Sequence, residues 1–212
     1  MSGFLITLEG IDGCGKTTQA RMLKERLERE AIPHLLTREP GGTAAGEKIR
    51  LLLLQKEHSL TDTAEILLYM AARAELVDTV IRPALEAGQV VVCDRYLDST
   101  VAYQGYGGQG DRAWIEALNK RVTKGLWPHL TFLFDLSVEE ALRRRCRSGD
   151  RIEERALSYH RRVRQGYRAI AEEEPARVIL IDATAPAERQ HEVVWIKIRE
   201  LFGLVSKKEA PR

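Results

Sequence analysis

A glycine-rich loop near the start of the chain lies between a short apolar run and a longer amphipathic stretch. Residues 10–17 read Gly-Ile-Asp-Gly-Cys-Gly-Lys-Thr and match the pattern G-x-x-x-x-G-K-[ST]. Glycine lets the backbone fold around an anion with its N–H groups turned inward. A helix that begins near Gly15 adds the partial positive charge of its N-terminus. The sequence therefore predicts a strand, a phosphate-binding loop and a helix in succession.

This loop also carries side chains that suit nucleotide chemistry. We expect Lys16 to reach the β- and γ-phosphates of ATP and the Thr17 hydroxyl to ligate Mg²⁺. The expected ATP-binding residues are Gly10, Ile11, Asp12, Gly13, Cys14, Gly15, Lys16, Thr17 and Thr18. A thiol at a helix N-terminus has a lowered pKa, so Cys14 is either a target for alkylation or a small residue that fills the loop.

Short apolar runs alternate with amphipathic segments along the rest of the chain. The expected strands are residues 4–8, 34–37, 90–93, 130–134 and 178–181. The expected helices are residues 17–30, 46–54, 63–87, 111–124, 138–146, 154–173 and 186–202. This alternation predicts an α/β fold in which a five-stranded parallel sheet is covered by helices on both faces. We expect a single domain over residues 1–212, with a polar tail at about 206–212.

Composition excludes several classes of protein. No apolar run approaches the roughly 18 residues of a membrane span, and residues 1–8 lack the pattern of a signal peptide. Three widely spaced cysteines argue against a disulfide framework, so we expect a cytoplasmic protein without a membrane partner. A net charge of +2 gives no general attraction to nucleic acid.

Aspartates end three of the expected strands, at Asp94, Asp135 and Asp182. Ligands of open α/β sheets bind beyond the carboxyl ends of the strands. Asp94 is followed by Arg95, so a carboxylate for a metal ion stands beside a cation for an acceptor phosphate. For Asp135 we favour a structural role in the turn that follows the strand.

The phosphate-binding loop alone does not name the reaction. A GTPase would also carry N-K-x-D, but residues 119–122 read Asn-Lys-Arg-Val and lack the aspartate that reads the base. The short chain and the position of the loop near its start suit a small-molecule kinase better. Another monophosphate or nucleoside kinase, a non-catalytic nucleotide-binding protein and a nucleic-acid-binding protein remain as alternatives at this point.

Four stretches of the sequence narrow the choice among these classes of protein. They are residues 9–18, Thr-Arg-Glu-Pro-Gly-Gly-Thr at 37–43, Tyr-Met-Ala-Ala-Arg at 69–73, and Asp-Arg-Tyr-Leu-Asp-Ser-Thr-Val-Ala-Tyr-Gln at 94–104. In their order and spacing the chain resembles the thymidylate kinase family over about residues 4–202. The resemblance implies the fold of a P-loop nucleoside-monophosphate kinase, transfer of the γ-phosphoryl group of ATP to dTMP with Mg²⁺, and a homodimer formed by apolar helix faces such as residues 66–74.

The resemblance also assigns roles to individual residues. Arg38 and Arg95 would hold the phosphate of dTMP, and Tyr69 would stack on thymine where the family commonly has Phe. Arg73 would bond a carbonyl of the base. The other expected contacts are Thr100 and Gln104 along the thymine edge, Tyr103 near the sugar, and Asp12 facing the acceptor sugar. Metal ligands would be Thr17 and Asp94, and the catalytic residues Lys16, Arg95, Asp12 and a lid arginine.

Five arginines crowd into nine positions of the expected lid, at about residues 143–153. They are Arg143, Arg144, Arg145, Arg147 and Arg151. Like charges this close repel one another unless an anion lies among them. The loop positions 11–14 contain no arginine, so the chain resembles the bacterial style of the family, in which a lid arginine acts. We expect Arg147 to be catalytic, with Arg145 next; a solvated helix face or a nucleic-acid patch is the alternative.

Overall fold

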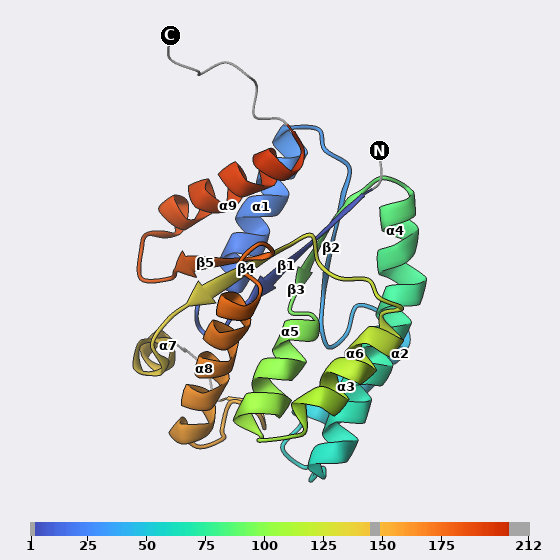
Figure 1. Cartoon of the computed structure of the whole chain (residues 1–212), viewed down its shortest axis with the longest axis vertical. Helices are drawn as coiled ribbons and strands as arrows, with labels where there is room; N and C mark the ends of the chain where they lie inside the picture. The colour runs from blue at the N-terminus through green and yellow to red at the C-terminus, as the bar shows by residue number, and fades with distance from the viewer. Residues whose placement is uncertain (1–2, 145–148, 204–212) are drawn as a thin grey trace.

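Five parallel strands form the central sheet of the computed structural model, which describes residues 3–144 and 149–203 (Figure 1). The strands are β1 (Phe4–Glu9), β2 (His34–Arg38), β3 (Val90–Asp94), β4 (Leu130–Asp135) and β5 (Val178–Asp182), and they follow the order β2-β3-β1-β4-β5. Each expected strand is confirmed and is one residue longer at its carboxyl end. That added residue is charged in every case, so the ends of the strands bring charged side chains to one edge of the sheet.

Helices cover both faces of the sheet (Figure 1). Their bounds are α1 (Lys16–Arg29), α2 (Ala44–Leu54), α3 (Asp62–Leu76), η1 (Val77–Ile81), α4 (Arg82–Glu86), α5 (Leu97–Thr100), η2 (Val101–Gly107), α6 (Arg112–Val122), α7 (Val138–Arg144), α8 (Leu157–Glu173) and α9 (Ala187–Leu201). Helices α1 and α9 lie together on one face, and α3, α4, α6 and α8 lie on the other. None of the helices in the described ranges combines the length and the hydropathy that crossing a membrane requires.

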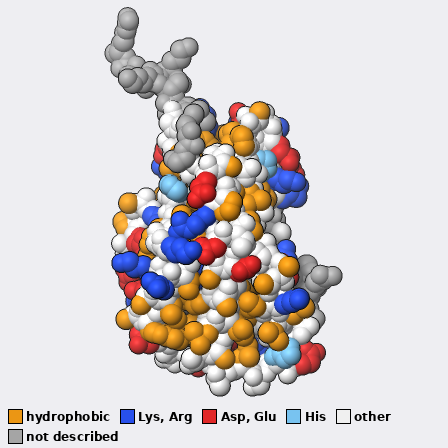
Figure 2. All heavy atoms as spheres, turned by 90° about the vertical axis from the view of Figure 1, so that its right-hand side faces the viewer, with side chains coloured by type: hydrophobic (Ala, Val, Ile, Leu, Met, Phe, Trp, Pro, Cys, Tyr) orange, Lys and Arg blue, Asp and Glu red, His pale blue; other side chains and the backbone are white. Residues whose placement is uncertain are grey.

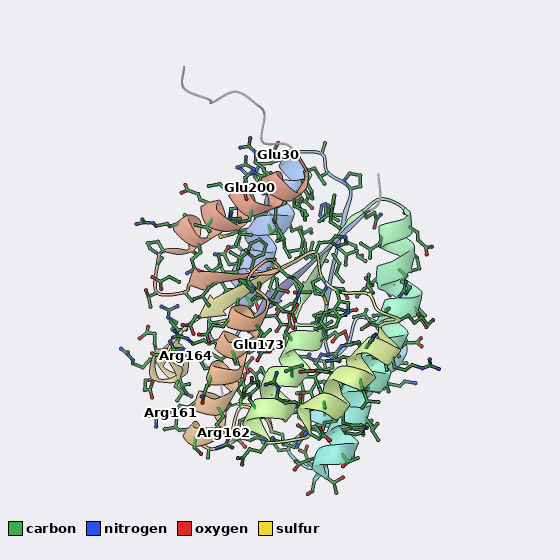
Figure 3. The ribbon with its side chains drawn as sticks, in the orientation of Figure 1. Glu30, Arg161, Arg162, Arg164, Glu173 and Glu200 are labelled. Carbon is green, nitrogen blue, oxygen red and sulfur yellow. The ribbon has the colours of Figure 1, made fainter. Side chains whose placement is uncertain are left out.

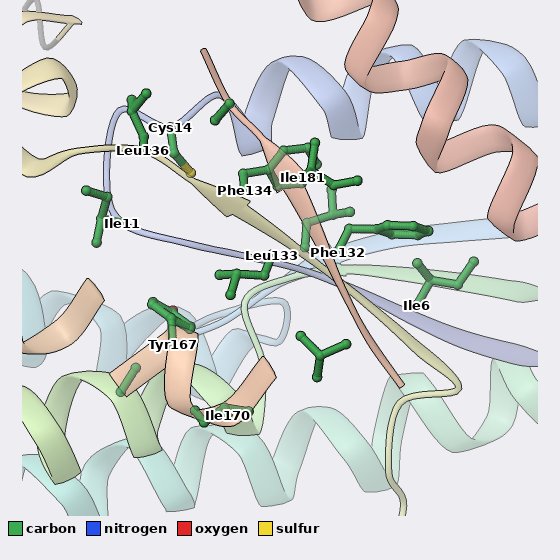
Figure 4. Packing of buried hydrophobic residues seen from close by; sticks show 14 of the residues in the cluster. Ile6, Ile11, Cys14, Phe132, Leu133, Phe134, Leu136, Tyr167, Ile170 and Ile181 are labelled. Atoms are coloured by element: carbon green, nitrogen blue, oxygen red, sulfur yellow. The ribbon is translucent and has the colours of Figure 1, made fainter. Parts of the chain in front are cut away.

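The core has one layer on each side of the sheet because successive residues of a strand point to opposite faces. Leu5 packs with Leu76 of α3, whereas the next residue, Ile6, belongs to the cluster that contains Leu23 of α1. Figure 4 shows the larger cluster, in which Phe132 and other side chains of β4 pack beside their neighbours on β1 and β5. Full burial of a leucine, isoleucine or phenylalanine side chain contributes about 1.5–3 kcal/mol to the stability of the fold.

The expected single helix over residues 63–87 is divided in the structure. An α-helix runs to Leu76, a wider π-helical turn follows at Val77–Ile81, and α4 then begins at Arg82. Pro83 is the second residue of α4, and the backbone on both sides of it is helical. Because proline has no N–H to donate to the preceding turn, the widened turn lies at the place where the regular bonding of the helix is interrupted. The turn lets the chain continue along the sheet, where Val77 and Ile81 are buried.

Residues 97–107 form α5 and η2, and sequence analysis assigned them no element. Val101, Ala102, Tyr103, Gln104 and Gly105 are all buried, so this segment lacks the division into an apolar and a polar face that identifies surface helices. Its valine, threonine, tyrosine and glycine residues are also weak helix formers. Packing against α8 stabilises the helix here, and it is this packing that places the residues after β3 around a cavity.

Candidate active site

The glycine-rich loop connects β1 to α1 and lies against the segment that follows β4. Gly10 and Gly13 have φ angles of 135° and 87°, a region that suits glycine. A Cβ atom on Gly10 would lie 2.6 Å from the Phe134 carbonyl oxygen, and one on Gly13 would lie 2.6 Å from the Ala141 carbonyl oxygen. The loop therefore requires glycine for its backbone conformation and for its close contact with the neighbouring chain.

Lys16 lies under this loop at the start of α1. Its buried ammonium donates hydrogen bonds to the carbonyl oxygens of Gly10 and Ile11, at 2.9 and 3.0 Å. The hydroxyl-bearing residues Thr17 and Thr18 are exposed on the first turn of α1. The lysine charge is thus held beside the backbone groups that suit a polyphosphate.

Cys14 is fully buried beneath the loop. Burial raises the pKa of its thiol even though the Lys16 charge acts in the opposite direction. The hypothesis of a low-pKa thiol at the helix N-terminus is therefore wrong, and Cys14 is a small residue that fills the loop.

Arg95 and Asp12 form an ion pair beside the loop. Arg95 Nη2 lies 2.6 Å from Asp12 Oδ1, and the Tyr103 hydroxyl donates to Asp12 Oδ2 at 2.9 Å. Burial raises the pKa of Asp12, but Arg95 and Lys16 outweigh it and hold this pKa well below its usual range. Asp12 is therefore an anion whose two oxygens are bound by an arginine and a tyrosine.

The backbone at Arg95 adopts the left-handed region, with φ of 69°. A side chain at such an angle costs on the order of 1 kcal/mol, and residues of this kind cluster at functional sites. The Arg95 N–H group donates to the Leu8 carbonyl oxygen at 3.0 Å, and Nη1 donates to the Gly10 carbonyl oxygen at 3.1 Å. These bonds place the guanidinium directly beside the glycine-rich loop.

A cavity, here called the tyrosine cavity, opens between α3, η2 and the loop. Its lining includes Asp12, Glu39, Pro40, Arg50, Leu54, Tyr69, Arg73, Arg95, Ser99, Thr100, Tyr103, Gln104, Asp150 and Ile152. The expected dTMP residues Tyr69, Arg73, Arg95, Thr100, Tyr103 and Gln104 are all among them. Residues from separate stretches of the sequence therefore line one hollow.

Arg73 is buried at the base of the tyrosine cavity and is held on several sides. Its Nε and Nη2 atoms donate to Glu39 Oε2 at 2.8 and 2.6 Å, and Nη2 also donates to the Thr100 hydroxyl at 2.9 Å. Nη1 donates to Asn119 Oδ1 at 2.6 Å. Tyr69 lies one turn before Arg73 on α3. Burial and the nearby Glu65 raise the pKa of its hydroxyl, so that this hydroxyl stays protonated.

A second hollow, here called the loop cavity, adjoins the first. It is lined by Asp12, Gly13, Gly15, Lys16, Thr17, Thr18, Arg38, Glu39, Arg50, Asp94, Arg95 and Glu153. Arg38 lies in this cavity rather than in the tyrosine cavity, and its guanidinium pairs with Glu47 at 3.1 Å. The two cavities share Asp12, Glu39, Arg50 and Arg95. Two phosphate-bearing ligands in these cavities would therefore meet at the Asp12–Arg95 pair.

Comparison with known proteins identifies the group to which this arrangement belongs. The family model described as thymidylate kinase matches residues 8–194. The chain belongs to the thymidylate kinase family. The thymidylate kinase of Halothermothrix orenii is 45% identical over 204 residues, covering 94% of this chain and 98% of the relative. That of Synechococcus sp. (strain JA-3-3Ab) is 54% identical over 178 residues, covering 84% and 86%.

A solved structure agrees with the sequence relatives. The crystal structure of thymidylate kinase from Ehrlichia chaffeensis superposes with a TM-score of 0.76 at 35% identity, covering 94% of this chain and 99% of that one. Members of the thymidylate kinase family are nucleoside-monophosphate kinases, so the chain is an enzyme. The alternatives of a non-catalytic nucleotide-binding protein and of a nucleic-acid-binding protein are thereby set aside.

The loop cavity offers oxygen ligands that would suit a divalent cation. Asp94 Oδ1 is buried and has no hydrogen-bond partner among the described residues. Asp94 and Thr17 line the same cavity. Mg²⁺ is usually held by one or two carboxylates together with substrate phosphates and water, so this sparse set of oxygen ligands fits it.

Glu9 also belongs to the site. It is the first residue of the motif at residues 9–18, and the sequence predicted no role for it. Its buried carboxylate accepts the backbone N–H of Tyr96 at 2.7 Å, the Ser99 hydroxyl at 2.6 Å and the Tyr167 hydroxyl at 2.8 Å. The same two hydroxyls each lie 3.2 Å from Arg95 Nη1. Burial, followed by the charge of a neighbouring aspartate, raises the pKa of Glu9 to about 7. Glu9 thus supports Arg95 through two hydroxyl groups.

The expected cluster of basic lid residues is not one group in the structure. Arg143 and Arg144 both pair with Glu140, one turn earlier on α7, at 2.6 and 3.0 Å. Arg151 turns inward and lies 2.6 Å from Glu65 Oε2. Glutamates therefore partner these arginines, although Glu140 is shared by two of them and Glu65 by Arg151 and Arg155. The expectation that an anionic ligand lies among the lid arginines stays a prediction. Arg147, expected to be catalytic, and Arg145 lie outside the described residues.

Other arginines beside the lid segment also have acidic partners. Figure 3 shows Arg161 and Arg164 on the side of α8 that faces α7. Arg161 pairs with Glu139 of α7 at 2.7 Å, and Arg164 binds both oxygens of Asp135 at 2.7 and 2.9 Å. The structural role favoured for Asp135 is thus supported, although its partner is a helix rather than a turn.

Arg50, Glu39 and Glu65 were missed by sequence analysis. Arg50 lines both cavities and donates to the Pro40 carbonyl oxygen at 2.9 Å. Glu39 stood within the motif at residues 37–43 and could have been singled out as the acidic partner of a buried arginine. Arg50 and Glu65 lie on ordinary amphipathic helices, and no local signal separates them from surface residues.

Proposed function

We propose that ATP binds in the loop cavity and dTMP in the tyrosine cavity, and that the enzyme transfers the γ-phosphoryl group to give dTDP and ADP. The observation that carries this assignment is the Asp12–Arg95 pair, which borders both cavities. Arg95 would stand where the transferred group passes from donor to acceptor. Its planar fork and permanent charge suit the phosphate of a nucleotide.

Catalysis in this arrangement consists of positioning and charge neutralisation. The acceptor is a phosphate oxygen that is already anionic, so the reaction needs no strong general base. Lys16 and Arg95 supply positive charge at the junction of the cavities. When bound by Thr17 and Asp94, Mg²⁺ would offset the charge of the ATP phosphates. The role expected for Arg147 stays a prediction.

The tyrosine cavity has features that suit a deoxynucleotide. Tyr69 offers an aromatic face for stacking, and Arg73 lies four residues further along the same face of α3. The Tyr103 hydroxyl bonds Asp12, so its ring is fixed near the place of the sugar. The bulk of this ring would disfavour a ribose 2′-hydroxyl. We assign the base to Tyr69, Arg73, Thr100 and Gln104.

The deciding experiment measures ADP release with MgATP and a panel of acceptors. The panel contains dTMP, dUMP, dCMP, dGMP, AMP, CMP, UMP and thymidine. We expect a clear preference for dTMP and no turnover of thymidine, because thymidine lacks the acceptor phosphate. Preference for another monophosphate would keep the ATP site and overturn the assignment of the tyrosine cavity.

We further propose a homodimer formed through α2 and α3. Leu51 and Leu52 of α2 and Leu67 of α3 are exposed by 56%, 42% and 47%. Figure 2 shows hydrophobic side chains gathered on the lower part of the face to which these helices belong. The expected interface around residues 66–74 needs one correction, because Ile66 is buried in the core and Leu67 is the outward residue.

The chain is proposed to act as one kinase unit over residues 1–212 in a reducing, cytoplasmic compartment. Cys14 and Cys93 are buried free thiols, in agreement with such a compartment.

A further inference from the structure

Glu65 lies behind the tyrosine cavity on the face of α3 that also carries Tyr69 and Arg73. These three residues are spaced by four, which places them one above another along the helix. Glu65 is buried, with only 2% of its side chain exposed. Its Oε1 atom accepts a hydrogen bond from Gln104 Nε2 at 2.8 Å. The glutamate therefore contacts a lining residue of the cavity from outside it.

The charge of Glu65 is balanced by two arginines from the segment before α8. Arg151 Nη2 and Arg155 Nη2 lie 2.6 and 2.8 Å from Oε2. Arg155 also stacks over the ring of Tyr159, with 4.6 Å from its guanidinium carbon to the ring centroid. Both guanidinium groups donate to this carboxylate, so Oε2 acts as a hydrogen-bond acceptor towards each of them.

An ionised carboxylate accepts hydrogen bonds and donates none. Gln104 must therefore turn its NH₂ group towards Glu65, because the opposite orientation would bring the amide oxygen against a carboxylate oxygen. The amide oxygen, Oε1, is then the polar atom that Gln104 can offer to the tyrosine cavity. Arg73, which lines the same cavity, offers only donors. One partner of Arg73 Nη1 is the sulfur of Met70 at 3.7 Å, a weak acceptor, so this N–H is the donor that a base in the cavity could take over.

We propose that Glu65 is a positioning residue that sets the base selectivity of the enzyme by fixing Gln104 as a hydrogen-bond acceptor. A donor at Arg73 and an acceptor at Gln104 match the O4 oxygen and the N3–H group of thymine and uracil. Cytosine carries an amino group at position 4 and an acceptor at N3, so both contacts would be reversed. This inference rests on the proposed binding of dTMP in the tyrosine cavity.

The test compares kcat/KM for dTMP, dUMP and dCMP in the unchanged enzyme and in Glu65→Gln. Glutamine at position 65 can present either an oxygen or an NH₂ group. The side-chain amide of Gln104 is then no longer held in one orientation. We expect the preference for dTMP over dCMP to fall by about tenfold or more, since a reversed polar contact costs at least that factor. The ratio of dUMP to dTMP should stay within about twofold, because both bases have the same edge.

Arg155→Gln is the matched control. It removes one ion pair from Glu65 but leaves the carboxylate in place, so it should lower stability without changing the ratio of dTMP to dCMP. If Glu65→Gln does not fold, because it leaves two partly buried cations with reduced compensation, the double variant Glu65→Gln, Arg155→Gln restores the charge balance. The same fall in selectivity is expected of the double variant.

The outcomes separate this inference from the proposed function. A folded Glu65→Gln enzyme that turns over dTMP with unchanged selectivity against dCMP would overturn the role of Glu65 and leave the kinase assignment standing. Equal changes in the dUMP and dCMP ratios would indicate a loosened cavity and would also overturn it. If the unchanged enzyme did not prefer dTMP, the proposed function and the inference would both fall.

Discussion

Asp12 and Arg95 are 2.6 Å apart although they are 83 positions apart in the sequence. Asp12 belongs to the glycine-rich loop, and Arg95 follows β3. Because β1 and β3 are neighbouring parallel strands, their carboxyl ends bring the two residues together. The ion pair holds Arg95 in a fixed position relative to the glycine-rich loop. Arg95 is the proposed ligand of the acceptor phosphate, and the loop is the proposed binding site of ATP.

Asp12→Asn is expected to lower kcat/KM for dTMP by about 10- to 100-fold. The change replaces an ion pair with Arg95 by a weaker contact, and hydrogen bonds to charged groups contribute about 1.5–3 kcal/mol. Steady-state kinetics at fixed MgATP measures this loss, and circular dichroism checks the fold. Tyr103→Phe removes a single hydroxyl from the same group and should have a smaller effect. An Asp12→Asn enzyme with unchanged kcat/KM would contradict the positioning role of Asp12.

Lys16→Ala should reduce kcat by at least about 100-fold, because it removes a preorganised charge from the phosphate site. The measurement is the rate of ADP formation at saturating dTMP, with the thermal midpoint recorded to confirm folding. Lys24→Ala, on the exposed part of α1, is the matched control and should keep the rate of the unchanged enzyme. Equal rates in the Lys16 and Lys24 variants would remove Lys16 from the mechanism.

Asp94→Asn should raise the Mg²⁺ concentration that gives half-maximal activity. The buried Oδ1 atom of Asp94 has no hydrogen-bond partner within the described part of the chain, and the amide is a weaker ligand for a hard cation. A titration of activity with Mg²⁺ at constant ATP measures the shift. Asp182→Asn is the control, since Asp182 ends β5 but bonds Thr184 in an exposed turn. An unchanged Mg²⁺ dependence would exclude Asp94 as a ligand.

Glu9→Gln should change the pH dependence of stability. The pKa of Glu9 is raised from 4.5 to about 7 on folding, so the native state binds more protons than the unfolded state between these values. The contribution of Glu9 to stability therefore falls as pH rises from about 4.5 to about 7. The variant cannot ionise at this position, and we expect its thermal midpoint to improve relative to the unchanged protein across that window.

The difference between the two midpoints is the quantity to measure, because other groups titrate equally in both proteins. Glu25→Gln, on the exposed surface of α1, serves as the control and should show a much smaller change. A difference that stays constant from pH 4.5 to pH 7 would mean that the pKa of Glu9 is not raised.

Leu67→Lys should shift the protein from dimer to monomer. The change places a charge in the apolar surface of α2 and α3, where a partner would have to bury it without a counter-ion. Sedimentation velocity at several concentrations measures the state of association. Ile196→Lys, at a similarly exposed position of α9 on the opposite face of the sheet, should leave it unchanged. A monomeric unchanged protein would contradict the proposed dimer directly.

Strands were the most predictable part of the fold because a buried parallel strand is a short, continuous apolar run. Residues 97–107 were not predictable in the same way, since a helix buried on nearly all sides has no amphipathic period. Arg151 shows a similar limit within the site. In the sequence it is one of five crowded arginines, whereas its partner Glu65 lies 86 residues away. Pairings over such distances have no local signature.

The phosphate-binding loop, the parallel sheet and the family could all be read from the amino-acid sequence, because they depend on local periodicity and on contiguous motifs. Which charged groups pair with one another became visible in the folded chain alone. Folding placed Glu9 beneath Arg95, turned Arg151 towards Glu65, and left one oxygen of Asp94 without a partner within the described residues. Burial and pairing of charges depend on which strand ends and helix faces come into contact. Those contacts are set by the packing of the whole chain, because the residues that form them are far apart in the sequence.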